Sequence, residues 1–417
     1  MAELPPEVQY LLLVVGLFVG PRILQRAYIP NAVSCLALGA ALGMGLGLFQ
    51  HDTTLALLAT LGIVSLFLFA GLEVDFSELR RGLRVVVQHL VVQSLLLAGV
   101  AWLLAWAFSL RPRAAVLMAL ALLTPSTGFI LDALPGFGLS EDRAHWVKTK
   151  AIASEILALV VLFVTVQSAD AAVFSVSSAA IASLVLVLPP LFRVFARYLL
   201  PHAPSSEFTF LVIVALLCAY LTRALGVYYL VGAFVVGVTA LRMQREIPSL
   251  ASPRLTHGVE LFASFFIPFY FLKAGLHLEA SDFTWQGLGL AVVFLLIMIP
   301  LRVGAVALHR RVSLGEPAAA GVRVGLALVP TLVFTIVLAD ILRERYELRP
   351  DLYGALIVVS LIDTALPGIL LRTSFSAMVE PQIRTMETPA DKRSHSADAA
   401  KTPMSSNPIP PGAGPIG

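Results

Sequence analysis

The sequence predicts an all-α polytopic membrane protein whose chain crosses a bilayer about thirteen times. Of its 417 residues, 58% are hydrophobic and 13% are charged, and the mean hydropathy is +0.87. A soluble domain would carry roughly 25% charged residues. Apolar runs of about 20 residues recur along most of the chain, and each is long enough to cross a hydrocarbon core of about 30 Å as a helix.

Thirteen apolar spans divide residues 1–378, which we expect to form one transmembrane domain. Their limits are about 8–26, 30–49, 53–74, 84–108, 113–134, 146–168, 171–198, 207–224, 226–243, 257–278, 285–309, 317–341 and 351–372. The start, MAELPPE, is acidic and no small-residue cleavage site follows the first run, so we expect a retained helix rather than a signal peptide. Residues 379–417 are polar and rich in Pro, Ser and Ala, which predicts a disordered tail.

The distribution of Lys and Arg among the loops predicts the orientation. If the N-terminus lies outside, most basic loop residues, among them Arg80, Arg81 and Arg84, lie inside. An odd number of spans then places the tail in the cytoplasm.

Two short sequence patterns occur twice, seven spans apart. FLFAGLEVD ends the third span and FLKAGLHLE ends the tenth. ALLTPSTGF in the fifth span resembles LALVPTLVF in the twelfth, so that Pro125 and Pro330 lie 205 residues apart. Because seven is odd, the two copies cross in opposite directions, which predicts an inverted repeat of the kind found in secondary transporters. The alternative is chance similarity in a Leu- and Ala-rich chain.

The two prolines predict two broken helices. Each stands near the middle of its span, where a proline removes a backbone hydrogen bond and clashes with the preceding turn. In lipid the freed groups must be satisfied by protein or by a water-lined cavity. Broken helices at corresponding places in two halves indicate a midplane ion site, although each one alone would be explained by a packed proline kink.

Three charged residues are predicted to lie within the membrane. Glu155 in the sixth span and Arg302 in the eleventh both lie roughly 10–14 Å from the inner edge, at 1.5 Å per residue. They can pair, as part of an ion site or as a structural ion pair, which would offset about 2.5–3.5 kcal/mol or more for each isolated charge. Asp363 in the last span is either a further transport acid or a partner of Arg302 or Arg323.

On these patterns the chain resembles the monovalent cation/proton antiporter family, which includes bacterial sodium/proton exchangers and Kef-type potassium efflux systems. The resemblance covers about residues 8–375 and rests on the span plan and on AGLEVDFSELRR, LLTPSTGFILDAL, AIASEILAL and IPLRVGAV. It implies an ion and proton site at Glu155, Ser154, Thr124, Ser126 and Thr127, with Arg302 as charge partner and Asp363 and Thr331 as secondary candidates.

The chain departs from this family's pattern in four ways. Glu155 stands where the family usually has Asp, and Ser154 replaces a preceding Asp or Asn. The second break, PTLVF, is less polar than in relatives, and the cytoplasmic nucleotide-binding domain of Kef-type systems is missing from this sequence.

The expected function is secondary active exchange of a monovalent cation, Na⁺ first and K⁺ or Li⁺ as alternatives, for protons. Glu155 would hold either a proton or a cation, and this competition would couple the two fluxes. Because Arg302 stays charged and Ser154 is neutral, a single midplane carboxylate would change charge, which makes the exchange electroneutral.

The resemblance also implies a division of labour among the helices. Scaffold and dimer helices would cover about 8–74 and 207–278, core transport helices 84–168 and 285–372, and a linker helix 171–198. Gly39, Gly43 and Gly47 form a small-residue stripe in the second span. In the family this region lies at a dimer interface, so we expect a homodimer, with packing inside one chain as the alternative.

Other functions remain as alternatives: a transporter of the same fold for another substrate, such as an organic anion, or a non-transporting sensor derived from the fold. The sequence holds no phosphate-binding loop, metal-ligand cluster or nucleophile–base pair in a loop. We therefore expect no enzyme activity, no cofactor, no resident metal and no nucleic-acid partner. The expected setting is the bacterial inner (plasma) membrane, with cation, H⁺ and lipid as partners.

Overall fold

The computed structural model describes residues 5–26, 29–74, 80, 82–203, 206–227 and 229–371. Within these ranges all regular structure is helical. Ten of the described helices are long and apolar enough to cross a membrane, or eleven if one bent pair counts as a single span. The predicted polytopic helical fold is confirmed. The predicted tail, 379–417, lies outside the described residues.

Helices stand at all thirteen predicted spans. The first half contains α1 (Pro6–Gln25), α2 (Asn31–Ala40) with its π-helical continuation η1 (Ala41–Gly45), α3 (Thr53–Leu72), α5 (Leu83–Phe108), α6 (Pro112–Leu123), α7 (Thr127–Ala133) and α8 (Glu141–Gln167). The second half contains α9 (Ala171–Val194) with η3 (Phe195–Leu199), α10 (Glu207–Ala224), α11 (Tyr229–Met243), α12 (Pro253–Leu276), α13 (Trp285–Leu314), α14 (Ala318–Ala327), α15 (Leu332–Tyr346) and α16 (Pro350–Leu370). Among the described helices at these spans, α2 with η1 and α11 are shorter than a full span.

Local sequence explains where several helices begin and end. The Asp52 side chain accepts the backbone N–H of Leu55 at 2.8 Å and so caps α3. α6 and α16 each begin with a proline, whose missing N–H costs nothing in the first turn. α13 ends at Gly315, which adopts a φ of +66°.

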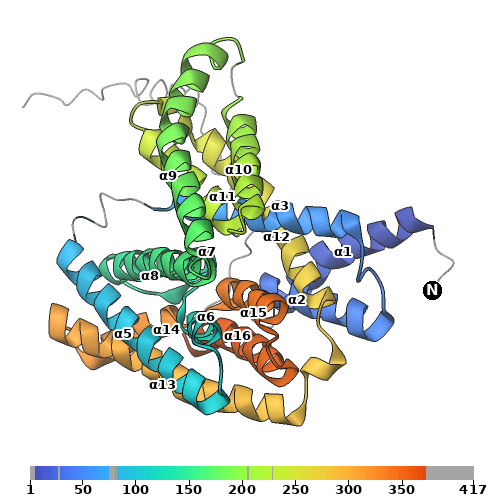
Figure 1. Cartoon of the computed structure of the whole chain (residues 1–417), viewed down its shortest axis with the longest axis vertical. Coiled ribbons are helices and arrows are strands. Elements are labelled where there is room, and N and C mark those ends of the chain that lie inside the picture. Colours follow the sequence, from blue (N-terminus) through green and yellow to red (C-terminus); the bar gives the residue numbers. More distant parts are fainter. Residues whose placement is uncertain are drawn as a thin grey trace, which may run out of the picture. The chain divides into compact units, whose positions relative to one another are not determined.

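The described helices pack in two sets. α1, α2 and α3 pack with α10, α11 and α12, while α5 to α8 pack with α13 to α16, and α9 contacts both α8 and α11. In Figure 1, α6 and α15 lie together among α5, α8, α13 and α16. These sets follow the predicted scaffold and core ranges, but their roles as fixed and moving parts stay a prediction.

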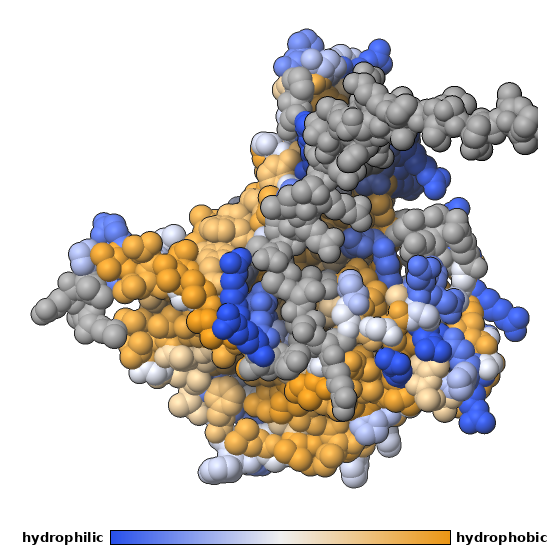
Figure 2. Space-filling view, turned by 180° about the vertical axis from the view of Figure 1, so that it is seen from behind, coloured by the Kyte–Doolittle hydropathy of each residue, from blue (hydrophilic) through white to orange (hydrophobic). Residues whose placement is uncertain are grey.

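The surface suits a lipid environment. Large hydrophobic side chains point outward along several spans, and Trp102 and Trp106 of α5 are 71% and 75% exposed. Figure 2 shows that hydrophobic residues dominate the lower part of the face in view, with hydrophilic residues gathered elsewhere. An exposed apolar surface of this extent is what a bilayer covers.

The glycine stripe of the second span is used inside the chain. A Cβ added to Gly39 would lie 2.0 Å from the backbone oxygen of Leu272, and one added to Gly43 would lie 2.7 Å from that of Leu276, both on α12. Gly275 of α12 is equally close to α2, because a Cβ added to Gly275 would lie 2.1 Å from the backbone oxygen of Leu36. Gly47 has open space and a φ of +65°. Gly39 and Gly43 therefore allow α2 to pack closely against α12, and they give no evidence for a dimer interface.

Replacing Gly39 with Ala should destabilise the protein, because α2 and α12 would have to separate. We expect a loss of about 1–3 kcal/mol, typical of an overpacked interior, seen as a lower temperature of thermal unfolding in detergent. Gly20→Ala is the matched control, because Gly20 is also inside a helix but has nothing within 4 Å of the place that an added Cβ would take. Equal unfolding temperatures for the two variants would contradict the close helix contact.

Candidate functional site

Two helix breaks cross at the centre of the second helix set. α6 and α7 are separated by extended residues Thr124 to Ser126, and α14 and α15 meet at a bend of 54° around Pro330. The residue before a proline is pushed away from helical dihedrals, and Thr124 accordingly has a φ of −83° and a ψ of 118°. Both breaks lie where the prolines predicted them.

Each break supplies hydrogen-bond partners for the other. The backbone N–H of Ser126 donates to the carbonyl of Pro330 at 2.8 Å, and the N–H of Val333 donates to the Ser126 hydroxyl at 3.0 Å. The Thr335 hydroxyl donates to the carbonyl of Ala121 at 2.7 Å. The backbone groups that the prolines release are thus satisfied within the protein, as a low-dielectric setting requires.

Asp363 of α16 is held on all sides beside the second break. Its carboxylate accepts hydrogen bonds from the Thr331 hydroxyl at 2.7 Å, from the Thr331 N–H at 3.4 Å and from the Thr364 hydroxyl at 3.1 Å. Nη1 of Arg302 lies 3.5 Å from Oδ2 of Asp363. Asp363 is therefore a fully paired, buried carboxylate.

The predicted pairing of Glu155 with Arg302 is not formed in this structure. Arg302 instead contacts Asp363 and donates from Nη2 to the Leu328 carbonyl at 2.8 Å, the end of α14. The reason is topological, since α13 packs mainly against α14 and α16, whereas Glu155 stands on α8. The alternative assignment, in which Asp363 is the partner of Arg302, matches the geometry.

Glu155 is a buried acid without a counter-ion. It is 3% exposed, and its carboxyl group faces the side chain and backbone of Thr127 at the start of α7. Among the described residues, no Lys, Arg or His forms an ion pair with it. The Thr127 hydroxyl itself has no partner at hydrogen-bonding distance within the described part of the chain. The Glu155 carboxyl group and the Thr127 hydroxyl thus face each other at the start of α7.

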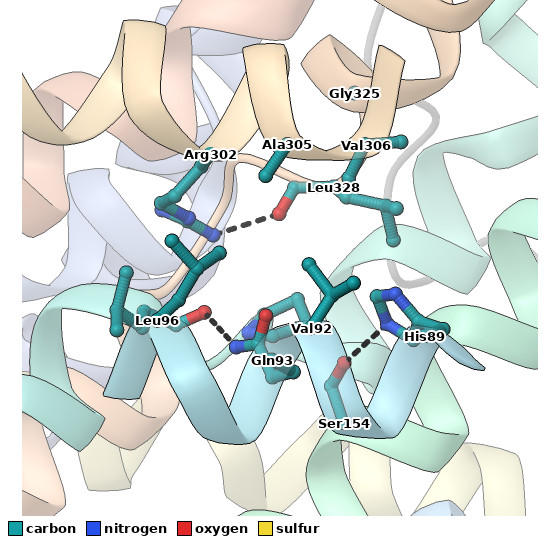
Figure 3. Close-up of a pocket in the computed structure, with 12 residues that line it drawn as sticks. His89, Val92, Gln93, Leu96, Ser154, Arg302, Ala305, Val306, Gly325 and Leu328 are labelled. Atoms are coloured by element: carbon teal, nitrogen blue, oxygen red, sulfur yellow. Dashed lines mark hydrogen bonds between the residues drawn. The ribbon is translucent and has the colours of Figure 1, made fainter. Parts of the chain in front are cut away.

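Ser154 and Glu155 are neighbours in sequence but face different surroundings. The Ser154 hydroxyl lies 3.0 Å from Nε2 of His89 on α5. Ser154 and His89 line a cavity of about 30 Å³ that Pro125, Gln93 and Arg302 also line. Figure 3 shows Arg302 reaching toward this space from α13 and His89 from α5. The space is large enough for a water molecule.

The repeat is visible in how the two breaks are held. Nε2 of Gln93, on α5, donates to the carbonyl of Leu123 at the end of α6 at 3.2 Å. Arg302, on α13, does the same for Leu328 at the end of α14. Glu155 and Asp363 likewise each face the threonine that follows a break. The equivalent positions differ in charge, because one half carries the neutral Gln93 and the other carries Arg302.

The sequence reasoning missed two groups of buried ionisable residues. Lys150, His89 and His309 meet at the end of the helices where α8 begins and α13 finishes, with Nζ of Lys150 2.7 Å from Nδ1 of His309. Toward the other end, Asp340 of α15 accepts a hydrogen bond from the Tyr353 hydroxyl at 3.0 Å. The available signal was an ionisable residue within an apolar span.

Asp340 also lines a cavity between the two helix sets. This cavity has a volume of about 290 Å³ and is lined by Lys273 and His277 of α12, by Thr60 of α3 and by Glu344 of α15. This polar cavity lies toward the end of the helices opposite Lys150. Glu155 does not line it and is buried by the surrounding helices.

The chain matches known proteins over most of its length. The sequence model of the family described as "Sodium/hydrogen exchanger, transmembrane" matches residues 11–376. A protein named "Probable Na(+)/H(+) antiporter 3" from Methanocaldococcus jannaschii is 25% identical over 381 residues, 87% of this chain and 94% of that protein. A "Na(+)/H(+) antiporter" from Enterococcus hirae is 21% identical over 378 residues, 87% of this chain and 96% of that protein.

A solved structure shares the fold. It is the sodium proton antiporter MjNhaP1 from Methanocaldococcus jannaschii at pH 8, with a TM-score of 0.64 and 16% sequence identity, and the match covers 89% of this chain and 97% of that one. The helical spans and these relatives together identify an integral membrane protein.

Removing the Arg302 side chain should strongly destabilise the fold. Arg302→Ala leaves the buried Asp363 carboxylate without its cation and the Leu328 carbonyl without its donor, which should cost about 3–5 kcal/mol. Arg302→Lys should cost less, and Asp363→Asn introduced into Arg302→Ala should recover part of the loss. Thermal unfolding in detergent measures all three variants.

Arg193→Ala serves as the control, because Arg193 pairs with Glu246 at the exposed surface and such pairs contribute little. An Arg302→Ala variant as stable as Arg193→Ala would show that the buried pair contributes nothing to stability.

Proposed function

Because the chain belongs to the sodium/hydrogen exchanger family, we propose that it exchanges a monovalent cation, Na⁺ first and K⁺ or Li⁺ as alternatives, for protons across a membrane. The observation that carries this proposal is Glu155, a buried carboxylate with no counter-ion among the described residues, beside the crossing of two broken helices. An isolated intramembrane acid is costly to keep, and binding an ion or a proton is the use that explains it.

Competition at one carboxylate couples the two fluxes. The Glu155 carboxylate is neutralised either by a proton or by a cation, and one site cannot hold both. Carboxylate, hydroxyl and carbonyl oxygens are ligands that hard cations prefer, and the Thr127 hydroxyl, unpartnered within the described part of the chain, supplies one next to Glu155. Thr124, Ser126 and Ser154 complete the proposed site, with the Ser154 hydroxyl held by His89.

The same geometry supports electroneutral exchange. Asp363 is engaged by Arg302, Thr331 and Thr364, so its charge is compensated inside the protein and is not offered to a transported ion. Arg302 keeps its proton through any physiological pH. Glu155 is then the one midplane group that changes partner in the cycle, and one proton replaces one monovalent cation.

The charges of the loops support a proposed orientation. We propose that the N-terminus lies outside and the tail inside the bacterial inner (plasma) membrane, because the basic loop residues then lie mostly in the cytoplasm. A homodimer stays part of the proposal on family resemblance alone. The helix set of α5 to α8 and α13 to α16 is proposed to move against the other set.

Glu155→Gln should abolish cation-driven proton movement, because a neutral amide can neither bind nor release the proton. Glu155→Asp should keep part of the activity, since the carboxylate remains but reaches less far. Purified protein in liposomes with a pH-sensitive dye, challenged in turn with Na⁺, Li⁺ and K⁺, measures both variants. Glu246→Gln is the matched control at an exposed site, and cation-driven exchange that survives Glu155→Gln would refute the assignment.

An imposed membrane potential should leave the initial exchange rate unchanged, because one positive charge moves in each direction per cycle. The measurement compares proteoliposomes with and without a diffusion potential of either sign that is set by a permeant anion, with sodium as the driving ion. Rates that follow the potential would mean that a second group titrates, and Asp363→Asn would then be the variant that restores independence from the potential.

A further inference from the structure

Two buried basic side chains touch each other near one end of the second helix set. Nζ of Lys150 on α8 lies 2.7 Å from Nδ1 of His309 on α13. Lys150 is 1% exposed and His309 is 7% exposed. Lys150 belongs to a run of helix that the proposed ion exchange does not use, and neither residue contacts Glu155 or Thr127.

The distance limits the charge that this pair can hold. A hydrogen bond between two basic nitrogens needs one proton and one lone pair. Lys150 and His309 therefore cannot both be protonated at their facing atoms, and the pair shares one proton. An ammonium that donates to Nδ1 leaves the other imidazole proton on Nε2, an atom that has no partner among the described residues.

The charged and titratable groups around the pair come from three directions. His89 of α5 has its ring centre 5.9 Å from that of His309. Arg310 follows His309 on α13 and forms an ion pair with Glu316, which precedes α14. The Glu316 side chain is 19% exposed and acts on Lys150 electrostatically. Its own charge is taken up by Arg310, so Glu316 does not compete with His309 for Lys150.

The pair stands at the end of a polar seam between two antiparallel helices. His309 and Arg302 lie seven residues apart on α13, and His89 and Gln93 lie one turn apart on the facing side of α5. The 30 Å³ cavity lies along this seam and is lined by His89, Gln93 and Arg302. It is lined by helices of one set only, unlike the cavity at Asp340, which lies between the sets.

We propose that Lys150 and His309 form a shared-proton site that passes transported protons along the α5–α13 seam, separately from the space between the helix sets through which the cation arrives. This inference rests on the proposed cation/proton exchange and assigns a route to the proton. The two residues act as relay groups and do not bind the cation.

The relay step conserves protons and bonds. The Lys150 ammonium gives a proton to Nδ1 of His309 while Nε2 of the same imidazole releases its proton to a water in the seam. The imidazole then turns away from Lys150, loses its Nδ1 proton to water and takes up a proton at Nε2, so that the tautomer is restored with no net change in protons. The Lys150 amine is recharged from solution on the Glu316 side and again donates to a bare Nδ1. Run in reverse, the same steps carry a proton out of the seam.

Three variants test whether Lys150 and His309 pass protons or whether Lys150 only contributes a positive charge to the fold. Lys150→Gln and His309→Gln both remove the shared proton and should slow exchange several-fold. The deficit should grow toward alkaline pH, where free protons are scarce, with an unchanged half-saturating sodium concentration. Lys150→Arg keeps the positive charge but has no usable neutral form, so it should be as slow as Lys150→Gln. Recovery of the wild-type rate and pH profile by Lys150→Arg would overturn the relay.

Lys148→Gln is the matched control, because Lys148 lies two residues away on α8 and pairs with Glu73 in a partly exposed position. It should exchange at the wild-type rate across the pH range. If Lys150→Gln and His309→Gln also match the wild-type pH profile, protons do not pass through this pair. Unfolding temperatures of the four variants show whether any slow variant is merely unstable.

A measurement without transport tests the shared proton directly. Histidine labelled with ¹⁵N in the Glu155→Gln background should show His309 as a neutral imidazole with an unprotonated Nδ1, and Lys150→Gln should change that signal. The His309 signal is assigned by its loss in His309→Gln. A doubly protonated His309 beside an intact Lys150 would overturn the proposal even if Glu155 is the transport acid. Exchange that survives Glu155→Gln would instead refute the assignment of Glu155, and the absence of cation-driven exchange by the wild-type protein would refute the proposed function; both leave the proton assignment standing.

Discussion

The rest of the structure depends on one constraint, the mutual hydrogen bonding of two interrupted helices that are buried inside the second helix set. Each proline frees backbone groups that lipid cannot bind, and the partner break takes them up through Ser126, Pro330, Val333 and Thr335. This crossing brings α6 and α15 together and places α8 and α16 beside it. The two buried acids, Glu155 and Asp363, are therefore positioned by the backbone rather than by pairing with each other.

The two halves of the repeat have diverged at equivalent places, and the difference in charge separates their roles. Arg302 and Gln93 hold the ends of α14 and α6 in the same way, but only Arg302 brings a charge. That charge compensates Asp363 and turns the second acid into part of the framework. Glu155 faces the neutral Thr127 instead. In the proposed exchange, Asp363 keeps Arg302 as its partner, whereas Glu155 binds the proton or the cation.

The polar groups outside the crossing lie on two different sides of it. Lys150, His309 and His89 lie within one helix set, along the seam between α5 and α13. Asp340, Lys273 and His277 line a space between the two sets. If one helix set moves against the other, the cavity between the sets changes shape. The seam between α5 and α13 keeps its shape, because both of its helices belong to one set. In the proposed exchange, the proton uses the seam and the larger cation uses the space between the sets.

The sequence by itself determined the number and order of the spans, the two breaks and the buried position of Glu155, because hydropathy, span length and proline chemistry act along the chain. It also predicted the inverted repeat from two pairs of matching segments. Which residues meet was decided by the tertiary structure. The position of Arg302 along its span predicted that it lies at the same depth as Glu155. Equal depth does not bring two side chains together, however, and the packing of α13 against α16 pairs Arg302 with Asp363. Packing likewise turned Ser154 toward His89, joined Gly39 to α12 and brought Lys150 against His309. These contacts, that between Arg302 and Asp363 included, join residues between 61 and 233 positions apart, and no pattern along the chain specifies which faces of distant helices pack together.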